Sequence, residues 1–120
     1  MKNTKLLLGI ALLSVVLLSA VNAPSASAKL VNACGSGFCI EVDTRGKNYT
    51  NRTEYVSNIY VFFGLGNVVE AWGDGFYKKA SGQKAFWWIN RWVRSGTYVC
   101  GATNVYGSSG RKIACIVIRV

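Results

Sequence analysis

Short apolar runs, rich in β-branched and aromatic residues and ended by glycine or serine, recur along residues 38–120. The run 38–44 (FCIEVDT) alternates, which places Cys39, Glu41 and Asp43 on one side of a predicted strand. Further runs cover residues 59–63, 68–72, 76–77, 97–105 and 111–120. Such spacing is typical of antiparallel strands joined by short turns. The pattern predicts an all-β fold, a small antiparallel β-sandwich or barrel.

Two parts of the chain depart from simple alternation. Residues 45–58 are polar with few aliphatic side chains, and they predict one long loop. Residues 97–105 and 111–120 carry apolar side chains on both faces, which is typical of strands that are covered on both sides. We therefore expect the last two strands to lie at the centre of their sheet.

The segment 84–94 (KAFWWINRWVR) holds four aromatic and three cationic residues and fits either a strand or a helix. In both conformations Trp88 and Trp92 share one face, whereas Trp87 shares the other with Arg91. The composition and the turn signal at 94–96 favour a strand. We expect Trp88 and Trp92 to lie in the core and Trp87 to lie at its rim or on the surface.

The four cysteines predict a disulfide-linked hairpin near each end of the domain. Cys34 and Cys39 flank a Gly-rich turn, and Cys100 and Cys115 flank residues 106–110 (YGSSG). A hairpin centred between positions 107 and 108 places Cys100 opposite Cys115, within reach of a disulfide. Geometry favours the pairs 34–39 and 100–115. The main alternative joins the two chain ends, for example through Cys39 and Cys100.

Residues 95–100 (SGTYVC) resemble the F strand of immunoglobulin-like domains, in which a tyrosine precedes a cysteine by two residues. The separation of Cys39 from Cys100 also suits that fold. However, the expected tryptophan is missing near position 53, and Cys34 and Cys115 have no counterpart in the pattern. The resemblance covers six residues, so it supports a β-sandwich and transfers no site residues.

The first 28 residues predict a cleaved secretory signal peptide. Lys2 and Lys5 precede an apolar run over residues 6–21, and small residues ending in Ala-Ser-Ala at 26–28 form a cleavage signal. We therefore expect a single secreted, extracellular domain over residues 29–120, without a transmembrane segment after processing. An oxidising environment also suits disulfides.

Composition narrows the chemistry of this domain. The chain has 14 basic residues, two of which leave with the signal peptide, and five acids, so the mature net charge is about +7. The absence of histidine excludes His-based triads and His metal sites. Glu41 and Asp43 are loosely spaced for glycoside hydrolysis, but solvated or ion-paired acids are more usual in a basic protein. The cysteine spacing does not suit zinc. We expect no enzyme, no cofactor and no metal.

The basic charge and the segment 84–94 point to an anionic partner. Lys84, Trp87, Arg91 and Arg94 are the candidate binding residues, because indole suits an interface and cations meet phosphate or carboxylate. The expected function is a secreted cationic antimicrobial or toxin-like protein that binds anionic envelope polymer or lipid of competing cells. Export makes nucleic acid an unlikely partner.

A second function fits the same features. A secreted binding module, or an inhibitor of an extracellular hydrolase, would present a disulfide-braced loop to a protein partner. The candidate loops are residues 105–111 and 44–53.

Overall fold

Eight antiparallel strands form two four-stranded sheets in the computed structural model, which describes residues 29–120. The predicted signal peptide, residues 1–28, lies outside the described residues. The strands are β1 (Lys29–Gly35), β2 (Phe38–Asn48), β3 (Thr53–Phe62), β4 (Val68–Gly73), β5 (Phe76–Ser81), β6 (Ala85–Arg94), β7 (Tyr98–Asn104) and β8 (Arg111–Val117). The prediction of an all-β antiparallel fold is confirmed.

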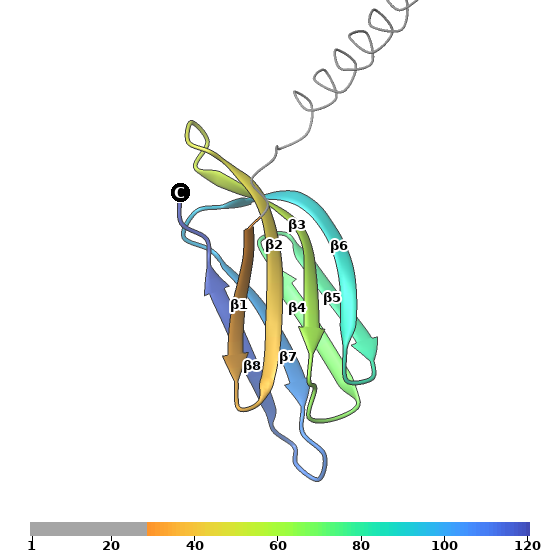
Figure 1. Cartoon of the computed structure of the whole chain (residues 1–120). Helices are drawn as coiled ribbons and strands as arrows, with labels where there is room; N and C mark the ends of the chain where they lie inside the picture. Colours follow the sequence, from red (N-terminus) through yellow and green to blue (C-terminus); the bar gives the residue numbers. More distant parts are fainter. Residues whose placement is uncertain (1–28) are drawn as a thin grey trace, which may run out of the picture.

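The two sheets lie face to face with the core between them. The first sheet has the order β1-β2-β3-β6 and the second has the order β5-β4-β7-β8, and Figure 1 shows the first lying over the second. Fully buried side chains come from both sheets: Phe38, Ile40, Val42, Val56, Ile59, Val61, Val69, Ala71, Val93 and Val99. Burial of this apolar surface is the main force that holds the sheets together.

Gly101 on β7 allows one close approach between the sheets. A Cβ atom there would lie 2.3 Å from Cγ2 of Ile40 and 3.1 Å from Cγ2 of Val61, both on the opposite sheet. Only glycine fits this contact without a shift of the neighbouring side chains.

A long hairpin of β2 and β3 replaces most of the loop predicted over residues 45–58. β2 continues to Asn48 and β3 starts at Thr53, so only residues 49–52 form the turn. The prediction is wrong because the pairing is irregular here. Register shifts flank Thr44, and Gly46 has a φ of 138°. Bulges of this kind interrupt the alternation on which a strand prediction depends.

Both favoured disulfides are present. Cys34–Cys39 closes the hairpin of β1 and β2, and Cys100–Cys115 joins β7 to β8. In each pair the two cysteines are direct partners in the strand register, as the hairpin geometry predicts. All cysteines of the described residues are used, so the alternative bridge between Cys39 and Cys100 is excluded.

The segment 84–94 forms strand β6 from Ala85 onward, which settles the choice between strand and helix. The assignment of its faces is the reverse of the prediction. Trp88 and Trp92 are 63% and 42% exposed, whereas Trp87 is half-buried and packs against the core. The two indoles predicted for the core therefore point outward.

The last two strands differ in position. β7 is central, as predicted, because it pairs with β4 and β8. β8 is an edge strand, so the prediction of a central position is wrong for it. Its outward apolar residues are left in contact with water, and Ile113 is 45% exposed. Apolar residues on both faces of β8 thus reflect an uncovered apolar surface and not double coverage.

Candidate functional site

The four predicted binding residues do not form one surface. Trp87 packs against the core, and Lys84 lies just before β6, whereas Arg91 and Arg94 lie near its end. Ten residues separate Lys84 from Arg94, which is roughly 30 Å along a strand. These four residues are therefore spread over the length of β6, and their role in binding stays a prediction.

Arg91 and Arg94 are engaged with the β4–β5 turn of the opposite sheet. Nη1 of Arg91 donates to the carbonyl oxygen of Gly75 at 2.5 Å. The guanidinium of Arg94 donates to both carboxylate oxygens of Asp74, each at 2.8 Å. The hydrogen bonds and charge of Arg94 lower the pKa of Asp74 from 3.8 to about 2. These two cations join β6 to the second sheet.

The outer side of the first sheet carries a cluster of seven aromatic side chains. They come from β3, from β6 and from the residue after β3, and we call this cluster the aromatic face. Its members are Tyr55, Tyr60, Phe62, Phe63, Phe86, Trp88 and Trp92. Their chain neighbours Val56, Ile59, Val61 and Val93 are fully buried on the inner side. Strand alternation, together with the register shift between Val56 and Asn58 that keeps Tyr55 and Tyr60 on the same side, thus separates an aliphatic inner surface from an aromatic outer one.

The strand register assembles these rings in rows. Tyr60 is the direct partner of Phe86, and Tyr55 is the direct partner of Trp92. The ring centroids of Tyr55 and Trp92 lie 5.4 Å apart, in an edge-to-face contact. Phe86 contacts Trp88 in the same way, at 5.0 Å. Each such contact contributes about 0.5–1.5 kcal/mol, so the rings also hold one another in place on the exposed surface.

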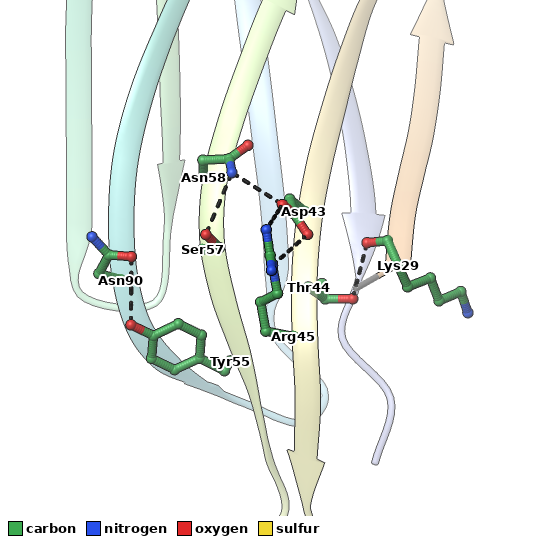
Figure 2. Close-up of polar contacts among 8 residues, drawn as sticks. All are labelled: Lys29, Asp43, Thr44, Arg45, Tyr55, Ser57, Asn58 and Asn90. Atoms are coloured by element: carbon green, nitrogen blue, oxygen red, sulfur yellow. Dashed lines mark hydrogen bonds and ion pairs between the residues drawn. The ribbon is translucent and has the colours of Figure 1, made fainter. Parts of the chain in front are cut away.

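Polar groups lie between and beside the rings. On β2, Asp43 accepts hydrogen bonds from Arg45 at 3.0 and 3.2 Å and from the amide of Asn58 at 3.2 Å. Figure 2 shows this group on β2 and β3, with the hydroxyl of Tyr55 donating to Asn90 beside it. The aromatic face therefore combines exposed rings with amide, hydroxyl and carboxylate groups.

Lys84 lines a hollow at the end of the aromatic face, beside the β3–β4 and β5–β6 connections, which run at the lower end of the molecule in Figure 1. The hollow measures about 510 Å³ and is lined by Tyr60, Phe62, Phe63, Gln83 and Lys84. This volume falls within the range of about 300–1,000 Å³ that is usual for small-molecule sites. One predicted binding residue thus belongs to the surface that the structure identifies.

The outer side of the second sheet has a different character because an arginine and a glutamate are paired among its aromatic rings. Arg111 forms an ion pair with Glu70 at 3.1 Å and lies 5.2 Å above the ring of Trp72. The hydroxyl of Tyr77 also donates to Glu70, and this bond raises the pKa of Tyr77. Tyr98 is exposed on the same sheet without an aromatic contact to the rest of this group.

The aromatic face was not predicted from the sequence, although one signal was available. Residues 59–62 (IYVF) alternate β-branched and aromatic side chains, and the β-branched ones face inward. The same rule applied to Ile89 and Val93 would have placed Trp88 and Trp92 outside. The adjacency of β3 and β6 carries no sequence signal, because these strands are not consecutive in the chain.

Comparison with protein-family models, with curated proteins and with solved structures found no match to this chain. Within residues 29–120, no group of three or more acidic or cysteine side chains is placed to hold a metal ion. None of the described segments is a helix with the length and hydrophobicity needed to cross a membrane.

Proposed function

We propose that this chain is a secreted antimicrobial or toxin-like protein that binds the envelope of competing cells through its aromatic face. The single observation that carries this proposal is the group of seven aromatic side chains on one side of a disulfide-braced β-sandwich. Contiguous exposed apolar surface of this kind marks interaction sites in small proteins. Binding and not catalysis is the activity that such a surface supports.

A sugar-containing envelope polymer suits this surface better than the hydrocarbon of a membrane. Glu41 and Asp43 on β2 lie directly beside Tyr60 and Asn58 in the register. Insertion of the face into acyl chains would remove water from the carboxylate of Glu41, which forms no ion pair within residues 29–120, without giving it a partner, which is costly. The hydroxyl groups of a sugar chain supply such partners, while the rings pack against its C–H surfaces.

The net positive charge brings the protein to an acidic polymer before the rings make contact. A mature charge of about +7 attracts a polyanionic surface from a distance and raises the local concentration of the protein. This attraction is screened as the Debye length falls to about 3 Å at 1 M salt. The aromatic contacts are uncharged and persist under those conditions. Accumulation therefore precedes docking.

Co-sedimentation with isolated bacterial cell walls tests the proposal. Trp88→Ala removes an exposed ring from the face, and Tyr98→Ala removes one of similar exposure from the opposite sheet as a matched control. We expect Trp88→Ala to weaken binding by about tenfold, because a central aromatic contact contributes more than about 1 kcal/mol. We expect Tyr98→Ala to bind like the wild type.

Two further experiments test the type of target and the antimicrobial activity. Vesicles of phosphatidylglycerol replace the cell walls in one arm, and wild-type binding to vesicles but not to walls would refute the polymer proposal. In the other arm, growth inhibition by the wild type and by Trp88→Ala is compared. Wall binding without any inhibition would contradict the antimicrobial part of the proposal.

One observation favours the alternative function of a protein-binding module or hydrolase inhibitor. The β7–β8 connection, residues 105–110, joins the two strands that are linked by Cys100–Cys115, and Tyr106 within it is 67% exposed. A braced hairpin with an exposed tyrosine suits docking to a protein at low ordering cost. Recovery of one stoichiometric extracellular protein with the wild type, and its loss with Tyr106→Ala, would support this alternative.

A further inference from the structure

The hollow at the end of the aromatic face has walls of two kinds. Tyr60 and Phe62 present rings stacked at a centroid distance of 4.9 Å and an interplanar angle of 24°. Phe63 stands against Phe62 at 67°, with the ring centroids 5.1 Å apart. Gln83 and Lys84 complete the lining with an amide and an ammonium group. The lining of the hollow thus combines the apolar surfaces of aromatic rings with one cation and one amide.

The cation in this hollow is available to a ligand. The ion pairs of the described residues involve Arg45, Arg94 and Arg111, and none of them involves Lys84. Within residues 29–120, the side chains of Lys84 and Gln83 also make no hydrogen bond to another residue of the protein. An anionic group that entered the hollow would therefore gain a charged partner without breaking an existing pair.

The hollow is fixed by backbone contacts between the two connections that form it. The amide of Gly64 donates to the carbonyl oxygen of Gln83 at 2.8 Å, and that of Gly82 donates to Asn67 at 2.6 Å. A Cβ atom at Gly64 would lie 2.7 Å from the carbonyl oxygen of Gln83, so glycine permits this approach. A site that is already formed needs little ordering when a ligand binds.

The backbone of Phe63 adopts a conformation that is unfavourable for a phenylalanine. Its φ is +58°, in the left-handed region that bulky side chains rarely adopt, and its side chain is 67% exposed. This backbone conformation is strained for a phenylalanine, and residues held in such conformations are frequent at ligand-binding sites. The ring of Phe63 consequently stands as a wall of the hollow and not as part of the core.

From these features we infer that the hollow binds one sugar residue that carries a carboxylate or phosphate group. The sugar ring packs on Tyr60 and Phe62, Lys84 pairs with the anion, and the amide of Gln83 meets a hydroxyl group. Charge complementarity selects the anionic sugar over its neutral counterpart. The inference rests on the proposed function and specifies which unit of the acidic polymer the aromatic face receives.

Amide chemical shifts of the ¹⁵N-labelled mature protein test the inference. The probes are galacturonate and galactose, which share a ring and differ in the acid group, and glucose 6-phosphate and glucose in parallel. We expect the acidic sugars to bind at least about tenfold more tightly than the neutral ones, with shifts centred on residues 60–64 and 82–84. Equal affinity for acidic and neutral sugars, or shifts centred elsewhere, would overturn the inference.

Three variants assign the selectivity to Lys84. Lys84→Gln should remove the preference for the acidic sugar, and Lys84→Arg should retain most of it. Lys79→Gln, which removes an exposed cation from β5 on the second sheet, is the matched control and should behave like the wild type. An unchanged preference in Lys84→Gln would overturn the inference.

The outcomes separate this inference from the proposed function. If Trp88→Ala weakens wall binding while Lys84→Gln leaves sugar selectivity unchanged, the aromatic face binds polymer and the inference about the hollow is wrong. If acidic sugars bind at Lys84 while wall binding does not depend on Trp88, the inference is supported and the proposed role of the face fails. A dispersed amide spectrum shows that each variant is folded.

Discussion

Trp87 and Trp88 are neighbours in the chain with opposite environments, because successive side chains of a strand point to opposite faces. Alternation in the sequence showed correctly that Trp88 and Trp92 share a face. It could not show which face is buried, since both faces of β6 contain large aromatic residues. The structure places Ile89 and Val93 inward with Trp87. The aliphatic side chains, which have no polar atom, determine the orientation of the strand.

Truncation of Trp87 and truncation of Trp88 should therefore differ sharply in their effect on stability. Truncation of a buried aromatic side chain typically lowers the free energy of unfolding by about 3–5 kcal/mol. We expect Trp87→Ala to lose a large part of this amount. Trp88→Ala should change the free energy of unfolding by less than about 1 kcal/mol, because this side chain is mostly exposed. Urea unfolding of both variants checks the order. A larger loss for Trp88→Ala would contradict the assignment of faces.

Elements were predictable where pairing is regular and unpredictable where it is not. The register of the last hairpin followed from its turn, and so did the disulfide of Cys100 and Cys115. The hairpin of β2 and β3 was missed because shifts near Thr44 and the left-handed Gly46 break its alternation. The polar composition of residues 45–58 therefore predicts a loop, although the strands continue through this segment. The edge position of β8 depends on which strands fail to pair with it, and sequence does not contain that information.

The link between β6 and the β4–β5 turn should give stability that depends on pH. Arg94 lowers the pKa of Asp74 to about 2 in the folded protein, below the 3.8 of an unperturbed carboxyl. A depressed folded-state pKa contributes stability above the unfolded value, and this contribution is lost as pH falls toward about 2.

The comparison of wild type with Asp74→Asn isolates this contribution. The melting temperature of the wild type should exceed that of Asp74→Asn by a constant amount near neutral pH. The difference should shrink as pH falls from about 4 to about 2, where Asp74 becomes protonated in both states. Thermal unfolding monitored by circular dichroism at a series of pH values gives the result. A difference that does not change over this range would show that the ion pair does not act as described.

At the scale of the whole molecule, the arrangement of the sheets creates a surface that no segment contains alone. β3 and β6 are neighbours in the first sheet but are separated in the chain by two strands of the second sheet. Their pairing brings together Tyr60 with Phe86 and Tyr55 with Trp92. The sequence indicated an aromatic and cationic segment, and Lys84, one of its predicted binding residues, lines the hollow beside these rings. It could not show that the aromatic partners come from a distant strand.

Several cations of the molecule are engaged in contacts away from the aromatic face. Arg91 and Arg94 are used to hold the sheets together, and Arg111 is paired on the second sheet. The rings of the first sheet remain without such partners. Under the proposed function, long-range attraction comes mainly from residues outside the aromatic face, and short-range docking comes mainly from its rings.

A footprint of cell-wall polymer on the protein tests the central claim most directly. Amide hydrogen exchange is measured with and without solubilised acidic wall polysaccharide, at a salt concentration that suppresses non-specific attraction. We predict slower exchange along β3, along β6 and in the connections around residues 63–67 and 82–84, with the second sheet unchanged. Protection centred on β4, β7 and β8, or no protection at a polymer concentration that saturates binding, would contradict the assignment of the aromatic face as the binding surface.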